Sequence, residues 1–105
     1  MQIQIRHDEN VKGDKSGWIA ATIESGLSRY ESQITTVEVH LADEDGPKNS
    51  DNAIRCSLEV RQAGFKPIAA TAHANNVGDA LEGALTKIER HLEHQMGRVR
   101  DVHRS

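Results

Sequence analysis

Aromatic residues are scarce in this sequence, which has one Trp, one Tyr and one Phe among its 105 residues. Hydrophobic residues of all kinds make up 36 % of the chain, so the core has to be built mainly from Val, Ile, Leu and Ala. RNA-binding sheets stack bases on exposed aromatic pairs. The alternating stretches of this chain lack such pairs, which argues against that form of RNA recognition.

Cysteine is almost absent too, since the chain contains only Cys56. One cysteine cannot form a disulfide within the chain, and its presence suits a reducing compartment. No apolar run approaches the roughly 20 residues that a membrane-spanning helix needs, and no signal peptide is recognisable. We therefore expect a cytoplasmic protein without membrane contact. The length fits one domain over residues 1–105, with an ordered core of about residues 1–98.

An excess of charge of either sign is also missing, because 13 Lys and Arg stand against 16 Asp and Glu, a net charge of -3. This balance argues against a general nucleic-acid binder. The charge is unevenly distributed, however. Residues 1–52 contain 5 basic and 10 acidic side chains, whereas residues 53–105 contain 8 and 6. Six histidines add positive charge as the pH falls toward about 6.5.

The sequence contains no Walker loop, dinucleotide fingerprint or nucleophile elbow. Cys56 occupies an inward position of an alternating stretch, which is typical of a small core residue rather than a catalytic thiol. His40 and His73 fall on outward strand positions, and His91 and His94 are three apart on a helix, but no thiolate pair or HExxH helix accompanies them. We expect isolated surface histidines, and therefore no metal, cofactor, small-molecule substrate or catalytic residue.

Four stretches alternate between apolar and polar residues, the period of a half-buried strand. They are Met1–Arg6, Ile34–Ala42, Ile54–Arg61 and Lys66–Asn75. Asp43–Asn52 is acidic and contains Gly and Pro, so it is predicted to be a loop between two antiparallel strands, and Gln62–Phe65 a short turn. The small alanines of the fourth stretch indicate that a helix packs closely against it.

Two stretches have a helical period. Lys15–Glu31 carries apolar residues at helical spacing, although Gly17 and Gly26 weaken the pattern. Trp18 falls off that apolar stripe, and we expect it to cover an edge of the core rather than to stack in an exposed position. The second stretch, Val77–Val99, is longer. Its apolar residues recur at three- and four-residue spacing: Val77, Leu81, Ala84, Leu85, Ile88, Leu92, Met96 and Val99.

Charged residues flank the apolar stripe of this long helix on both sides. One flank, here called the basic shoulder, spans about 100° of arc and contains Lys87, Arg90, His91, His94 and Arg98. The other, the acidic shoulder, contains Glu82, Glu89 and Glu93. Such flanks can be a solvated surface with local ion pairs. Cations aligned on a rigid helix can also follow the phosphates of a nucleic acid, and the pattern alone leaves both interpretations open.

The order of these elements predicts the fold. Each strand alternates, so only one face of the sheet is buried, and two helices with one apolar stripe each have to cover that face. We therefore predict an α+β two-layer sandwich, a four-stranded sheet with two helices on one face in the order β-α-β-β-β-α. Its core should contain Ile3, Ile5, Val37, Val39, Leu58, Val60, Ile68, Leu81, Leu85, Ile88 and Leu92.

Several segments, in this order and at this spacing, resemble one known family. They are MQIQIR at the start, ITTVEVHL before an acidic Gly-containing loop, and ALEGALTKIERHLEHQMGR in the long helix. The family is that of the ribosome hibernation factors, which comprises hibernation-promoting factor, ribosome-associated inhibitor A and the sigma-54 modulation proteins. The likeness extends over about the whole of Met1 to Arg98 and is to the short members.

This resemblance implies the fold predicted above and a cytoplasmic, non-enzymatic protein. It implies a partner, the small ribosomal subunit, whose rRNA is bound in the decoding channel so that translation is silenced under stress. The family uses basic helix residues against rRNA, and Lys87 and Arg90 match its pattern best. We therefore expect Lys87, Arg90, His91, His94 and Arg98 to contact RNA, and we expect a monomer.

Two departures from the family pattern define the alternatives. The short members are usually more basic in the second helix and its tail, and the long members add a C-terminal dimerisation domain that this chain lacks. A protein-interaction or ligand-binding module of the same fold, without ribosome binding, is therefore the main alternative. A metal-binding regulator that uses the histidines is a third.

Overall fold

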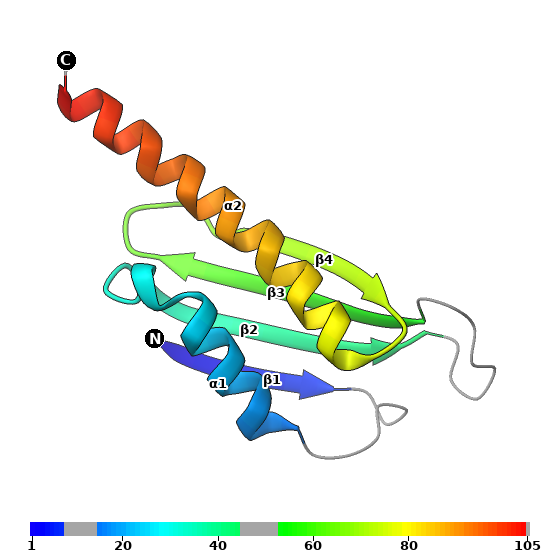
Figure 1. The fold of residues 1–105 in the computed structure, drawn as a ribbon. Coiled ribbons are helices and arrows are strands. Elements are labelled where there is room, and N and C mark those ends of the chain that lie inside the picture. The colour runs from blue at the N-terminus through cyan, green and yellow to red at the C-terminus, as the bar shows by residue number, and fades with distance from the viewer. Residues whose placement is uncertain (8–14, 45–52, 105) are drawn as a thin grey trace.

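The computed structural model describes residues 1–7, 15–44 and 53–104, with side chains described through Gln95. Figure 1 shows the element order, which confirms the predicted one. The elements are β1 (Gln2–His7), α1 (Ser16–Gly26), the 3-10 helix η1 (Ser28–Tyr30), β2 (Ile34–Asp43), β3 (Ile54–Gln62), β4 (Ile68–Ala74) and α2 (Val77–Arg104). Most of the loop predicted at Asp43–Asn52 lies outside the described residues.

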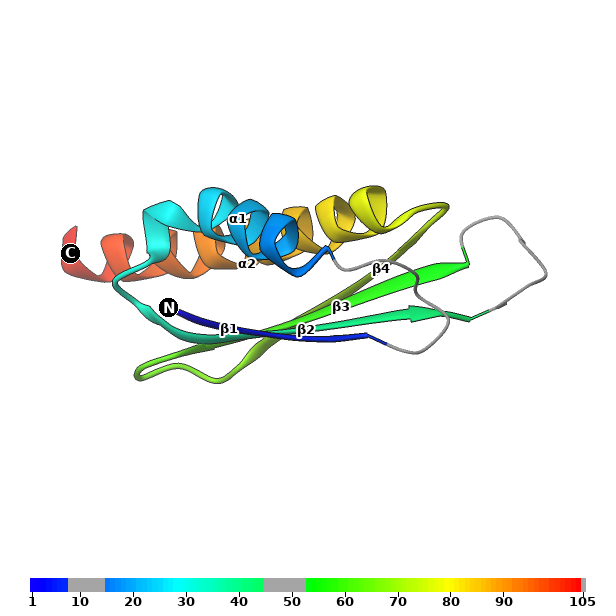
Figure 2. The same cartoon turned by 90° about the horizontal axis from the view of Figure 1, so that it is seen from below.

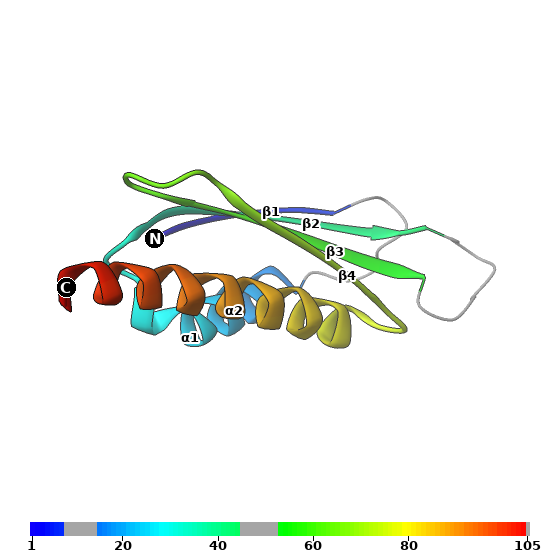
Figure 3. The ribbon, with the colours of Figure 1, turned by 90° about the horizontal axis from the view of Figure 1, so that it is seen from above.

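The four strands form one sheet in the order β1-β2-β3-β4. Strand β1 pairs with β2 in parallel, and the two other pairs are antiparallel. Both helices lie on one face of this sheet, and the other face is open (Figure 2; Figure 3). The predicted α+β two-layer sandwich is thus confirmed, with β1 and β4 as the two edge strands.

The register of β2 and β3 brings apolar residues together on the covered face. Val37 lies opposite Val60, and Val39 lies opposite Leu58. All four are buried, because this face meets the helices. A slip of one residue would turn the whole set toward solvent, so burial fixes the register.

Nine of the eleven residues predicted for the core are buried. They are Val37, Val39, Leu58, Val60, Ile68, Leu81, Leu85, Ile88 and Leu92. Ile3 and Ile5 are only partly buried and pack against the core. The prediction that they are buried was therefore wrong. Both belong to β1, an edge strand with a neighbour on one side only.

The structure corrects several boundaries. The helix predicted at Lys15–Glu31 ends at Gly26 and continues only as the short η1. Helix α2 extends to Arg104, beyond the expected Val99, because no Pro follows to end it and Gly97 does not interrupt it. Strand β3 includes Gln62, whose side chain is buried, and the turn that follows contains Gly64 at φ 84°. A positive φ of this kind favours glycine.

Trp18 is 49 % exposed, so the expectation that it covers an edge of the core was wrong. The buried residues of α1 are Ile19 and Ile23, on the side of the helix that faces the sheet. Trp18 lies on the flank that faces α2, where its ring is 3.5 Å from the position a Cβ would take on Gly78.

Helix α2 approaches β4 most closely at Gly83. A Cβ on Gly83 would lie 2.9 Å from the Cβ of Ala72, which is shorter than a van der Waals contact between two carbons. The small side chains of β4 therefore do allow a helix to pack closely, as their sequence predicted. Glycine at 83 and alanine at 72 together set the separation of the helix from the sheet.

Replacement of Gly83 by Ala is expected to destabilise the protein. The added methyl group would force α2 away from β4, and overpacking of this kind costs about 1–3 kcal/mol, more than the gain of up to about 1 kcal/mol in helix propensity. Urea unfolding of Gly83→Ala measures the loss. Ala72→Gly in the same background should recover part of it.

Gly17→Ala is the matched control, since nothing lies within 4 Å of a Cβ at that helical position. It should leave the free energy of unfolding unchanged or raise it slightly. Equal effects of the two substitutions would contradict a tight contact at Gly83.

Cys56 belongs to the core, as its inward position predicted. Its side chain is fully buried, and burial raises the pKa of the Cys56 thiol to about 11. The thiolate is the reactive form of cysteine. The position of Cys56 in the sheet interior therefore gives it a packing role.

A thiol reagent should react with Cys56 only when the protein unfolds. With a pKa of about 11, roughly one thiol in a thousand is ionised at about pH 8, and burial also blocks access. Absorbance assays with an aromatic disulfide reagent should show slow labelling of the native protein and rapid labelling in denaturant. Rapid stoichiometric labelling of the native protein would contradict the buried position.

Candidate nucleic-acid interface

The start of α2 is fixed by an asparagine cap. The Asp79 backbone N–H donates to Asn76 Oδ1 at 2.8 Å, and Asn76 Nδ2 donates to Asp79 Oδ2 at 3.1 Å. The Ala80 N–H adds a bond to the Asn76 carbonyl. A cap of this kind satisfies backbone donors that the helix itself leaves unpaired. It also fixes where the helix begins, and so which residues fall on each flank.

The basic shoulder lies on the flank of α2 that is turned toward β4. Lys87, Arg90, His91 and His94 are all exposed there, on the same side of the helix as Gly83. Arg98 lies in α2 beyond the residues whose side chains are described, so its role stays a prediction. The structure thus brings the four described members of the predicted site onto one surface.

Lys87 makes a contact that sequence reasoning missed. Its Nζ donates a hydrogen bond to the backbone carbonyl oxygen of Thr71, 2.5 Å away. Thr71 lies in β4, an edge strand that has no further strand to accept its outward backbone groups. Lysine on a sheet edge is one of the devices that prevent pairing with another strand. Lys87 therefore connects α2 to the sheet edge as well as contributing charge.

Arg90, His91 and His94 are the members of the shoulder that point into solvent. No hydrogen bond or ion pair joins any of them to another side chain within the described part of the chain. The salt bridges found there, Arg61–Glu59 and His73–Glu44, both lie away from α2. The interpretation of the shoulder as a surface stabilised by local ion pairs therefore has no support among these residues.

The acidic shoulder lies on the opposite flank of α2, beside α1. Glu89 Oε1 is 3.1 Å from the position that a Cβ would take on Gly26, the last residue of α1. Glu82 and Glu93 are exposed on the same flank. The charges are therefore separated across the helix rather than interleaved.

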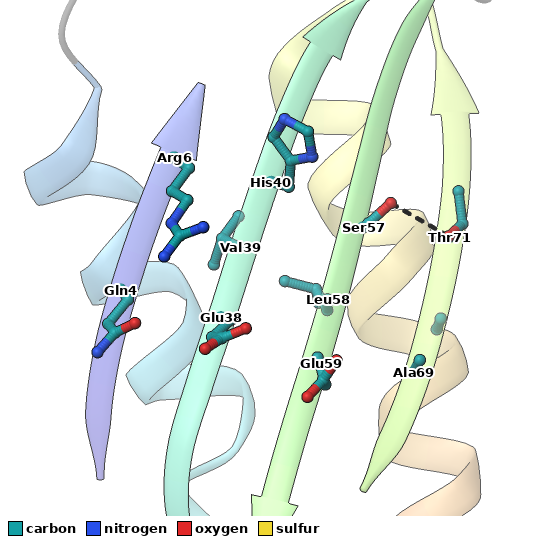
Figure 4. Close-up of a pocket in the computed structure, with 11 residues that line it drawn as sticks. Gln4, Arg6, Glu38, Val39, His40, Ser57, Leu58, Glu59, Ala69 and Thr71 are labelled. Carbon is teal, nitrogen blue, oxygen red and sulfur yellow. Dashed lines mark hydrogen bonds between the residues drawn. The ribbon is translucent and has the colours of Figure 1, made fainter. Parts of the chain in front are cut away.

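The open face of the sheet has a mixed charge. Figure 4 shows a shallow pocket of about 350 Å³ on this face, where Arg6 and His40 lie beside the carboxylates of Glu38 and Glu59. The hydroxyls of Ser57 and Thr71 are 3.2 Å apart. Arg6 lies opposite His40 in one cross-strand row, and Glu38 lies opposite Glu59 in the next. The acidic row offsets the basic one, so the surface offers a phosphate backbone less net attraction than the basic shoulder.

Potential metal ligands do not cluster on the described surfaces. Among residues 1–7, 15–44 and 53–95, no three His, Cys, Asp or Glu side chains lie close enough to hold one ion. His73 Nε2 is 2.6 Å from Glu44 Oε1, a pair without a third such side chain among the described residues. The described helices also include none with the length and apolar character of a membrane span.

The fold is similar to that of two solved structures. One is a ribosomal subunit interface protein from Coxiella burnetii, with a TM-score of 0.70, 17 % identity and coverage of 92 % of this chain and 99 % of that chain. The other is the N-terminal domain of Protein Y from Thermus thermophilus, with a TM-score of 0.70, 16 % identity and coverage of 90 % and 98 %. At this identity the likeness shows the fold.

Sequence comparison gives the family. No curated protein matches the chain significantly. A sequence model of the family described as "Sigma 54 modulation protein / S30EA ribosomal protein" matches residues 7–100. This match spans most of the chain and includes both helices, so the protein belongs to the sigma 54 modulation protein / S30EA ribosomal protein family, as its resemblance to the hibernation factors implied.

Proposed function

We propose that this protein is a non-enzymatic, cytoplasmic ribosome-associated factor. It binds rRNA in the decoding channel of the small subunit and silences translation there as a monomer. Family membership supports association with the ribosome, as does the likeness to a ribosomal subunit interface protein. The observation that carries the proposed site is the row of exposed basic side chains along one flank of α2.

The length and rigidity of the basic shoulder suit a nucleic-acid backbone. From Lys87 to Arg98 the helix rises by about 16 Å, so its cations can meet several consecutive phosphates. A helix capped at Asn76 and packed on the sheet holds them in place before binding. Charged contacts of this kind position a protein on RNA without reading its sequence.

The two shoulders together orient the protein. Phosphates attract Arg90 and its neighbours and repel Glu82, Glu89 and Glu93 on the opposite flank. Only a docking pose that turns the β4 edge toward the RNA is therefore favourable. This explains how a chain with a net charge of -3 can still present a cationic surface to a polyanion.

Loss of Arg90 is expected to weaken ribosome binding in a salt-dependent way. Each neutralised phosphate contributes a slope of about -0.7 to -0.9 to the dependence of log affinity on log salt. Arg90→Gln should therefore make this slope shallower by about 0.7–0.9. Co-sedimentation with purified 30S particles at several salt concentrations provides the measurement.

Lys66→Gln is the matched control, because Lys66 is an exposed cation in the β3–β4 connection and does not belong to α2. Arg90→Gln and Lys66→Gln remove the same charge from the same protein. If both variants lose affinity equally, net charge rather than the basic shoulder governs binding. If neither loses any, the shoulder is a solvated surface.

A further inference from the structure

A second surface of the helical layer lies between α1 and α2. The two helices run side by side in the same direction (Figure 1), with Trp18 beside Gly78 at one end and Gly26 beside Glu89 at the other. A groove of about 580 Å³ separates them. Residues of both helices line it, among them Trp18, Ala21, Gly26, Glu82, Leu85 and Glu89.

Apolar side chains contribute part of the lining of the groove. Ala21 of α1 and Leu85 of α2 line it together with the half-exposed ring of Trp18. Tryptophan is usually largely buried, and its large ring dominates contacts at protein interfaces. An exposed Trp beside apolar lining residues is therefore typical of a surface that receives a partner.

The charge of the groove has one sign. Its only ionisable lining residues are Glu82 and Glu89, and no basic residue lines it. Glu89 Oε1 lies 3.1 Å from the Cβ position of Gly26, at the C-terminal end of α1. A helix C-terminus carries a partial negative charge, and α1 has no basic residue in its last turn to offset it. Arg29 follows in η1, where its guanidinium lies against the Tyr30 ring, and it is not among the residues that line the groove.

We propose that this groove docks a lysine- or arginine-rich segment of another protein. One basic side chain would lie over the Trp18 ring near Glu82, where a cation–π contact adds to the charge attraction. A second would lie beside Glu89 at the end of α1. Glu82 and Glu89 are about 10 Å apart along the helix axis, which is about three residues of extended chain, and an apolar residue between the two cations would cover Leu85.

The chemistry of the groove selects a basic protein segment over RNA. Its carboxylates repel RNA, whose phosphates suit the opposite flank of α2. A second copy of the chain carries its cations on the basic shoulder, and the dependence of binding on protein concentration distinguishes that occupant. The proposal is independent of rRNA binding, because it concerns other residues and another partner class.

The only Trp of the chain lies in this groove, so intrinsic fluorescence reports on its occupancy. The probe is a synthetic peptide in which Arg or Lys recurs at every third position between Leu and Ala. Addition of this peptide to the full chain should change Trp18 fluorescence saturably, and added salt should weaken the effect. A peptide with Glu at each basic position should have no effect.

Variants test the charge requirement. Glu82→Gln combined with Glu89→Gln should weaken peptide binding about fivefold to tenfold, the effect of two lost surface charge pairs. Glu24→Gln combined with Glu38→Gln removes the same charge outside the groove and should leave affinity unchanged. Calorimetry measures peptide binding to variants that lack the indole ring of Trp18. Trp18→Leu should weaken binding, whereas Phe65→Leu, at the other exposed large hydrophobic residue of the described chain, should not.

Three results would overturn the proposal. The first is equal binding by both double variants, which would assign the effect to net charge. The second is a fluorescence change with a short RNA oligonucleotide that matches the change with the peptide. The third is a Trp18 signal that depends on protein concentration alone and disappears in the Glu82→Gln, Glu89→Gln variant, because the occupant would then be a second copy of the chain.

Discussion

The contact between α2 and β4 at Gly83 and Ala72 determines which surfaces of the helical layer are exposed to partners. A Cβ at position 83 would lie only 2.9 Å from the Cβ of Ala72, so this close approach requires glycine where α2 meets β4. In this rotation of the helix about its axis Leu81, Ile88 and Leu92 are buried and the two flanks of the helix are exposed. The packing of α2 on β4, rather than charge, therefore determines which side chains of the helix are exposed to partners.

The same rotation gives the two flanks different surroundings. The basic shoulder emerges over β4, the edge strand of the described sheet, where Lys87 can reach the Thr71 carbonyl. The acidic shoulder emerges beside α1 and becomes one wall of a groove. One helix thus presents a convex cationic surface on one side and a concave anionic surface on the other. These shapes suit an extended polyanion and an inserted side chain, respectively.

Periodicity in the sequence was sufficient to predict the fold. The alternation around Val37 and Leu58 and the helical spacing around Ile88 each depend on one element and one buried face, so local pattern determines them. Ile3 and Ile5 alternate equally well but are less buried, because alternation does not show that a strand lies at an edge. The end of α1 at Gly26 was also missed, since the apolar spacing continues through Leu27 and Tyr30 although the helix does not.

The candidate site was predictable only in part, for a related reason. The position of Lys87, Arg90, His91 and His94 on one flank follows from helical geometry alone, and the structure bears this geometry out. The hydrogen bond from Lys87 to Thr71 and the groove beside Trp18 depend on how separate elements meet. No sequence pattern within one segment predicts how two segments pack against each other. Lys87 illustrates both cases. Its position on the basic shoulder follows from helical spacing, and its charge suits RNA. Its hydrogen bond to the sheet edge depends on how α2 packs on β4, and this bond holds the helix that carries Arg90. Arg90, which has no such second role among the described residues, is therefore the shoulder residue whose charge can be separated from the stability of the fold.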